Sequence, residues 1–193
     1  MGRNNFRVVV MPALCAAMML LSSCSVNVKK EPTGEDKQVD INTLVGGVHV
    51  SKQPDVSDIG LAIYPGARLK EKDSDGGDKN ANVNISGFGF GLKVVAMEYE
   101  SDDPPAKVVS FYKDQLKKYG KIVECHNSGM DMDMGHGSKG ESDELTCEGS
   151  TGNHIELKVG KKYDQHIVAV EPQGKGSNFS LVYVRTHGKD GDI

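Results

Sequence analysis

One stretch of this sequence, residues 104–119, has the spacing of an amphipathic helix. Asp103 is the expected N-cap, Pro104 suits the first helical position, and Gly120 is expected to end the helix. The other apolar segments alternate apolar with polar residues, as strands do. A chain with several strands and one helix has few ways to build a core. The apolar residues that share one face of the helix are Val108, Val109, Tyr112, Leu116 and Tyr119.

The expected strands are short and are separated by turns rich in Gly, Asp and Asn. The strongest strand covers residues 83–100, and residues 39–50 predict a short hairpin around Gly46 and Gly47. The sequence therefore predicts an α+β fold, with a curved and mostly antiparallel sheet and the helix of residues 104–119 packed on one face. Further strands are expected at residues 121–125, 144–148, 155–159, 165–170 and 179–185.

The N-terminus has the pattern of a targeting segment. Arg3 and Arg7 precede an apolar run, residues 8–21, that is shorter than the about 20 residues needed to span a bilayer. Leu21-Ser22-Ser23-Cys24 follows and resembles the lipobox of bacterial lipoproteins. In that family the cysteine thiol receives a diacylglycerol, the peptide is cleaved before it, and the new amine is acylated. The alternative is an ordinary secretory signal with an incidental cysteine.

This resemblance implies a domain organisation and a location. Residues 1–23 would be the signal peptide, and the polar residues 24–38 a lipidated flexible tether. Residues 39–187 would form a single α+β domain, and residues 188–193 a loose C-terminal tail. Ser25 stands where Asp tends to retain lipoproteins at the inner membrane, so the resemblance implies the periplasmic face of the outer membrane. The membrane, through the lipid on Cys24, and an envelope protein are the expected partners.

The four cysteines have different expected fates. Cys15 leaves with the signal peptide and Cys24 carries lipid, which leaves Cys125 and Cys147 in a compartment that permits disulfides. We expect this pair to bond, because no CxxC spacing supports the alternatives of a metal-binding pair or two free thiols. Closing a loop of this length stabilises a fold by about 3 kcal/mol in the chain-entropy model.

A loop rich in Met and His follows Cys125. Thioether sulfur suits Cu(I), and imidazole with carboxylate suits Zn(II) or Cu(II), so the loop is a candidate metal site. The alternative is a solvated loop in which Met is flexible filler. The candidate ligands are His126, Met130, Met132, Met134 and His136.

Two further pieces of sequence resemble uncharacterised exported bacterial proteins. Residues 60–67 contain a Tyr-Pro-Gly-Ala turn, and residues 109–120 contain Phe-Tyr in the expected helix before a final Gly. The resemblance implies a small exported α+β domain and carries over no catalytic residue.

The remaining patterns narrow the function. GxSxG and HExxH are absent, and the Gly-Phe-Gly-Phe-Gly of residues 87–91 lacks the ending of a phosphate loop. The formal net charge is −4, which gives no electrostatic reason to bind nucleic acid. We therefore expect no catalytic residue and no cofactor. The sequence favours an envelope lipoprotein with a non-enzymatic binding or structural role, and the alternative is a periplasmic copper or zinc protein.

Overall fold

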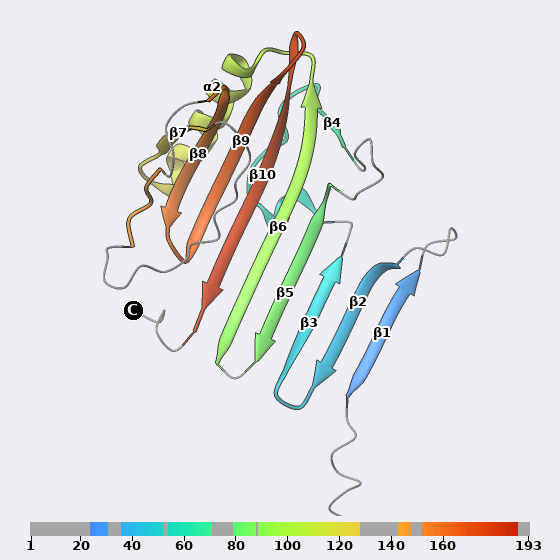
Figure 1. Cartoon of the computed structure of the whole chain (residues 1–193). Helices are drawn as coiled ribbons and strands as arrows, with labels where there is room; N and C mark the ends of the chain where they lie inside the picture. The colour runs from blue at the N-terminus through green and yellow to red at the C-terminus, as the bar shows by residue number, and fades with distance from the viewer. Residues whose placement is uncertain are drawn as a thin grey trace, which may run out of the picture.

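The computed structural model describes residues 24–30, 36–51, 54–70, 79–87, 89–127, 143–147 and 152–188. In these residues ten strands form one antiparallel sheet, in the order β1-β2-β3-β5-β6-β10-β9-β8-β7, with β4 beside β6 (Figure 1). The strands are β1 (Ser25–Lys30), β2 (Asp36–Thr43), β3 (Gly46–Ser51), β4 (Arg68–Leu69), β5 (Ala81–Gly87), β6 (Phe90–Ser101), β7 (Val123–Asn127), β8 (His154–Lys161), β9 (Asp164–Gln173) and β10 (Gly176–His187).

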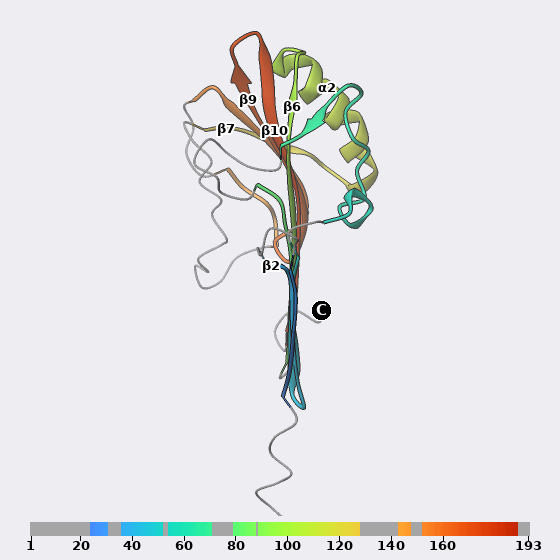
Figure 2. The ribbon, with the colours of Figure 1, turned by 90° about the vertical axis from the view of Figure 1, so that its right-hand side faces the viewer.

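The α+β prediction is wrong, because the sheet dominates the described residues and stays open. Their one α-helix, α2 (Pro105–Leu116), packs mainly on β8, β9 and β10 and shares a core with the upper part of β6. A helix of this length extends about 18 Å. At about 4.8 Å between strands the sheet is roughly 40 Å wide. Among the described residues the single helix therefore leaves much of the sheet without a second layer, as the edge-on view shows (Figure 2).

The helix itself agrees with the sequence analysis. Val108, Val109, Tyr112 and Leu116 are buried, and a 3-10 turn, η2 (Lys117–Tyr119), continues α2 to Gly120. The start differs from the prediction, because Pro104 occupies the N-cap position and makes no side-chain cap bond.

The Asp103 carboxylate, expected to cap the helix, binds two other side chains. It accepts hydrogen bonds from Tyr64 Oη at 2.8 Å and from Lys107 Nζ at 2.7 Å. These bonds hold the pKa of Asp103 below its usual value, mainly through Lys107.

The core lies between α2 and the upper parts of β6, β8, β9 and β10. Tyr112 is fully buried there, with its ring 5.6 Å from that of Phe179, and its hydroxyl accepts a hydrogen bond from the Tyr64 backbone N–H at 3.1 Å. The chain before β4, which includes a 3-10 turn, η1 (Val56–Asp58), closes the core with Ile59, Leu61 and Tyr64. The remaining core residues from the sheet are Val95, Met97, Tyr99, Leu157, Val159, Val168, Val170, Phe179 and Leu181.

Two strand predictions need correction. Residues 83–100 form the hairpin of β5 and β6 rather than one strand, and Gly89, with φ +79°, lies in the turn. This backbone conformation favours glycine, so Gly89 permits the chain to reverse between β5 and β6. Residues 144–147 are described and form no strand, although the hairpin of β2 and β3 is confirmed.

The N-terminal residues of the described chain are strands where the sequence predicts a flexible tether. β1 begins at Ser25, directly after Cys24, and β2 begins at Asp36. β1 is the edge strand of the sheet and pairs with β2 from Ser25↔Asn42 to Lys30↔Asp36. Cys24 is thus attached to the sheet without a linker.

The predicted disulfide is confirmed. Cys125 on β7 and Cys147 are bonded, with their Cα atoms 5.5 Å apart and 22 residues between them in sequence. Cys125 is buried, and the backbone N–H of Lys162 donates to the Asp143 carbonyl at 3.1 Å. These contacts tie residues 143–147 to the β7–β8 side of the sheet.

Candidate interaction surface

The sheet has two parts with different surroundings. We call the part under α2 the covered half, and we call β1, β2, β3, β5 and the lower ends of β6 and β10 the open half (Figures 1 and 2). Among the described elements, β1, β2, β3 and β5 make extensive contacts only with neighbouring strands. The open half is therefore a single layer.

The strand register aligns apolar residues across the open half. Paired residues on neighbouring antiparallel strands point to the same face. One row therefore consists of Val26, Ile41, Val48, Ile85 and Leu92, and the next consists of Val28, Val39, Val50, Val83, Val94 and Val184. We call these two rows, together with Phe90, the apolar face.

The apolar face lies on the opposite side of the sheet from α2. Along β6, Leu92 and Val94 point away from the helix side, whereas Val95 and Met97 belong to the core beneath α2. The apolar side of the sheet thus changes between Val94 and Val95. Any second layer on the open half must therefore cover the side that α2 does not.

The other side of the open half is polar. Its central row consists of Asn27, Asp40, His49, Asn84 and Lys93. His49 Nδ1 lies 2.5 Å from the Asp40 carboxylate, and this hydrogen bond holds the pKa of Asp40 below its usual value. Lys93 Nζ donates to Asp58 at 2.8 Å. The polar side chains on this side contact one another and suit a hydrated surface, whereas the apolar face favours burial.

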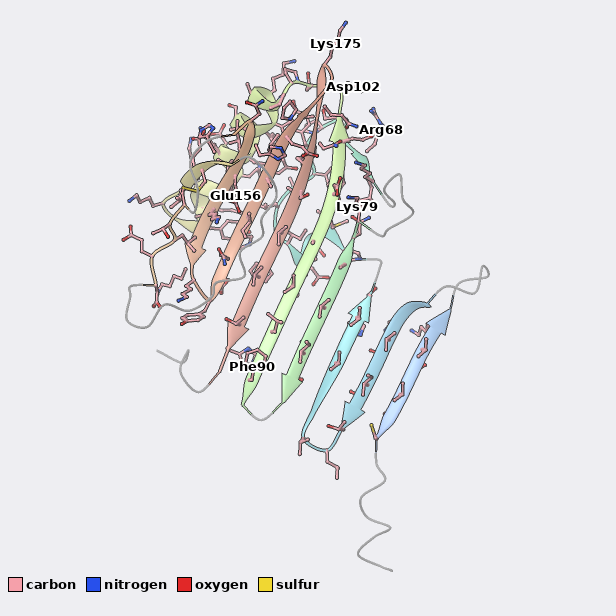
Figure 3. All side chains as sticks on the ribbon, viewed as in Figure 1. Arg68, Lys79, Phe90, Asp102, Glu156 and Lys175 are labelled. Carbon is pink, nitrogen blue, oxygen red and sulfur yellow. A yellow bond between two sulfur atoms is a disulfide. The ribbon has the colours of Figure 1, made fainter. Side chains whose placement is uncertain are left out.

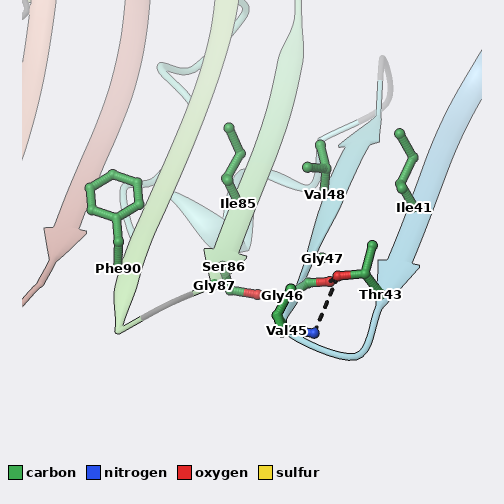
Figure 4. A pocket seen from close by; sticks show the side chains of 10 residues that line it. All are labelled: Ile41, Thr43, Val45, Gly46, Gly47, Val48, Ile85, Ser86, Gly87 and Phe90. Atoms are coloured by element: carbon green, nitrogen blue, oxygen red, sulfur yellow. Dashed lines mark hydrogen bonds between the residues drawn. The ribbon is translucent and has the colours of Figure 1, made fainter. Parts of the chain in front are cut away.

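A hollow lies at the lower end of the apolar face (Figure 4). Its volume is about 420 Å³, and Phe90 stands on its rim with 48% of its surface exposed. Gly46 and Gly87 are paired at its floor, and a Cβ on Gly46 would collide with the Ser86 carbonyl oxygen. The close approach of these two strands keeps the hollow empty of side chains. The lining residues are Ile41, Thr43, Val45, Gly46, Gly47, Val48, Ile85, Ser86, Gly87 and Phe90.

The candidate lipidation residue lies at the same end as the hollow. Because Ser25 pairs with Asn42, the exposed Cys24 lies beside the turn that joins β2 and β3. That turn presents Leu44 and Val45, with 77% and 54% of their surfaces exposed. The lower end therefore combines an exposed thiol with exposed apolar side chains.

The candidate metal loop falls almost entirely outside the described residues. Met130, Met132, Met134 and His136 lie in residues 128–142, which the structure does not describe. His126 is exposed on β7, with Nε2 3.7 Å from the Glu124 carboxylate. Within the described ranges no group of three or more His, Cys, Asp or Glu side chains is arranged to hold a metal ion.

Several charged groups at the upper end form ion pairs, and Figure 3 labels three of them, Arg68, Lys79 and Asp102. Arg68 donates to Asp102 at 2.9 and 3.0 Å and to Glu100 at 2.9 Å, and it lowers the pKa of Asp102. Glu98 lies 3.1 Å from Lys70 Nζ and 3.5 Å from Lys79 Nζ. These paired charges border the upper end of the sheet and leave the apolar face uncharged.

A buried histidine marks the covered half. His166 stacks on Tyr119 with ring centroids 3.8 Å apart and lies 4.8 Å from the Tyr183 ring. Burial lowers its pKa from the usual 6.5. The polar residues around it in the sequence indicate a surface histidine, but the ring is buried and packs against Tyr119 and Tyr183 instead.

Comparison with protein-family models, curated protein sequences and solved structures finds no match to this chain. A search of the described residues for a helix long and apolar enough to cross a bilayer is also negative. The surface itself is therefore the basis for a functional argument.

The apolar face was not predicted, although the sequence contains its signal. Pairs of β-branched or aliphatic residues two positions apart recur at Val26 and Val28, Val39 and Ile41, Val48 and Val50, Val83 and Ile85, and Leu92 and Val94. Each pair alone indicates only a half-buried strand. The repetition of the pair in five segments would have indicated two rows across one sheet.

Proposed function

We propose that this chain is an envelope lipoprotein with a non-enzymatic role, which binds a protein partner through the apolar face while Cys24 carries the lipid anchor. The lipobox sequence before Cys24 supports the anchor. The observation that carries the binding role is the continuous pair of apolar rows, with no described residue layered on them. At the strand spacings of a sheet, the face covers on the order of 500 Å².

A surface of this kind has a strong tendency to be covered. Burying apolar surface is favourable by about 25 cal/mol per Å², so the face offers on the order of 10 kcal/mol before the losses of association. A contiguous apolar patch of this size marks an interaction site on many proteins. Because the opposite side of the open half is polar, the open half has one apolar binding side rather than two.

The anchor is tested by membrane fractionation of cells that express the full chain. We expect Cys24→Ala to release the protein from the membrane fraction, and Cys15→Ala, in the apolar run before it, to leave it bound. Mass spectrometry of the wild-type protein should show an N-terminal Cys24 that carries acyl chains. An unmodified Cys24, or equal membrane association of both variants, would contradict the anchor.

The binding role is tested by a charge placed on either side of one strand. Ile85→Asp puts a carboxylate on the apolar face, and Asn84→Asp puts one on the polar side of β5. After formaldehyde treatment of intact cells, we expect a cross-linked species in Asn84→Asp and its loss in Ile85→Asp. Equal cross-linking of the two variants would exclude the apolar face as the binding surface.

A further inference from the structure

We infer that the partner on the apolar face is a second copy of this chain, packed face to face about a twofold axis that runs parallel to the strands. The inference names the partner of the proposed binding surface and does not depend on lipidation of Cys24. It joins two single-layer open halves into one two-layered sandwich.

The apolar face is complementary to itself. None of the residues that define it carries a charge, so two copies meet without placing like charges opposite each other. Two faces on the order of 500 Å² bury roughly 1,000 Å² in total, which is the lower limit for a specific interface. Two aligned sheets pack about 10 Å apart and within about 30° of each other, as in natural sandwiches. Rows of Val and Ile are typical of such inner faces.

The hollow gives this packing a specific fit. With the axis between β3 and β5, the β6 strand of each copy lies opposite β2 of the other. Phe90, at the lower end of β6, then stands over the part of the hollow formed by Ile41 and Thr43 of the second copy. An exposed aromatic ring on each copy thus has an empty apolar site of about 420 Å³ on the other.

The same axis agrees with the position of Cys24. A rotation about a line parallel to the strands keeps the lower end of each copy at the lower end of the dimer. Both Cys24 residues, which directly precede Ser25 at that end, therefore face the same way. Two copies anchored in one membrane can form this dimer without leaving it.

The described residues of the covered halves do not obstruct the dimer. The axis places β10 of each copy opposite β1 of the other and sends the β7–β9 side past that edge of the described sheet. Residues 143–147, which the Cys125–Cys147 bond holds against the covered half, then lie beyond that edge.

A flat bilayer fits this surface less well than a second sheet does. Cys125 points to the same side of the sheet as the apolar face, and its disulfide holds residues 143–147 on that side. These residues would stand between the covered half and a flat bilayer. Above the apolar face, Glu98 pairs with two lysines and Arg68 pairs with two carboxylates, so the two signs balance and leave no patch of excess positive charge. The chain as a whole carries a formal charge of −4, so anionic lipid offers no attraction.

The inference is tested by cysteine cross-linking of the full chain in intact cells. Ile85→Cys places a thiol next to the twofold axis on the apolar face, and Asn84→Cys places one on the polar side of the same strand. A short bismaleimide is added, and denaturing gels are run. We expect a species of twice the monomer mass in Ile85→Cys and at least a tenfold lower yield in Asn84→Cys.

A second substitution tests the fit of the ring. Phe90→Ala in the Ile85→Cys chain should lower the cross-linked fraction several-fold, because the ring no longer fills the hollow of the second copy. Intact Cys125–Cys147 bonding serves as the check that each variant is folded. An unchanged yield would contradict the proposed axis.

Other occupants of the face give different results, and each overturns the inference. Cross-linking of Ile85→Cys to a product of any other mass indicates a different protein, which leaves the proposed function intact. Quenching of a fluorophore on Ile85→Cys by spin-labelled lipid, without the double-mass species, indicates a bilayer. The experiment is repeated with Ile85→Cys in the Cys24→Ala chain. If this chain leaves the membrane fraction and still gives the double-mass product, the two copies pair without help from the membrane, and the inference stands.

Discussion

The covered half and the open half share strands but not an environment. β6 and β10 run through both, and their hydrogen bonding continues without a break. In the covered half, Met97 and Leu181 face α2, and in the open half Leu92 and Val184 face the opposite side. The sheet thus contains two apolar surfaces on opposite sides, and the described residues supply a helix for only one of them. Within the described residues, only the covered half has its second layer from the chain itself, and this difference is the basis of the proposed binding role.

The largest expected effect comes from one pair of leucine truncations. Leu181 is fully buried in the covered half, so Leu181→Ala should lower the free energy of unfolding by about 3–4 kcal/mol. Leu92→Ala, a half-exposed position on the apolar face, should lower it by about 1 kcal/mol in dilute protein. Urea unfolding at pH 7 measures both. Equal losses would mean that the open half has a covered core of its own.

The second effect concerns the disulfide of the covered half. The bond closes a loop across 22 residues, so its removal in the Cys125→Ser/Cys147→Ser double variant should lower the free energy of unfolding by about 3 kcal/mol. The open half should keep its single-layer structure, and hydrogen exchange of β2, β3 and β5 under native conditions should change little. Loss of exchange protection in those strands first would show that the disulfide also supports the open half.

A smaller effect is expected from one buried hydroxyl. In Tyr112→Phe the backbone N–H of Tyr64 loses its acceptor inside the covered half, which should lower the free energy of unfolding by about 1–2 kcal/mol. Tyr163→Phe removes the hydroxyl of an exposed tyrosine and serves as the control, with no measurable change expected. A negligible loss in Tyr112→Phe would mean that water reaches this part of the core.

The smallest of the four effects is a pH dependence from His166. Burial lowers the pKa of this histidine, so below pH 6.5 the unfolded chain binds a proton that the native protein does not. The stability that His166 contributes is therefore complete above pH 6.5 and falls as the pH drops toward 5. Asp164 and Lys118 face the ring, with opposite effects on the pKa, and are left unchanged. Chemical unfolding of the wild type at several pH values should show this slope, and His166→Gln should flatten it.

Local patterns predicted local structure well. The apolar steps of Val108, Tyr112 and Leu116 identified the helix, and two unassigned cysteines identified the disulfide. The number of layers over each part of the sheet was not predictable in the same way. The spacing of apolar residues identifies a helix but does not show how much of a sheet that helix covers. The prediction of a single strand at residues 83–100 was wrong because glycine is compatible both with a curved strand and with a turn. The positive φ of Gly89, which the sequence does not reveal, shows that the chain turns there. The prediction of a flexible tether was wrong for β1. Two apolar residues, Val26 and Val28, are too few to indicate a strand until their pairing with Ile41 and Val39 is known.

The most direct test of the central claim is the reactivity of two neighbouring thiols in intact cells. Ile85→Cys and Asn84→Cys lie on opposite sides of β5, and each is treated with N-ethylmaleimide, with the denatured protein as the reference. If the apolar face is covered in the cell, the thiol at residue 85 should react at least tenfold more slowly than the thiol at residue 84. Equal rates would show that the face is bare, and would contradict the account of the open half as a binding surface.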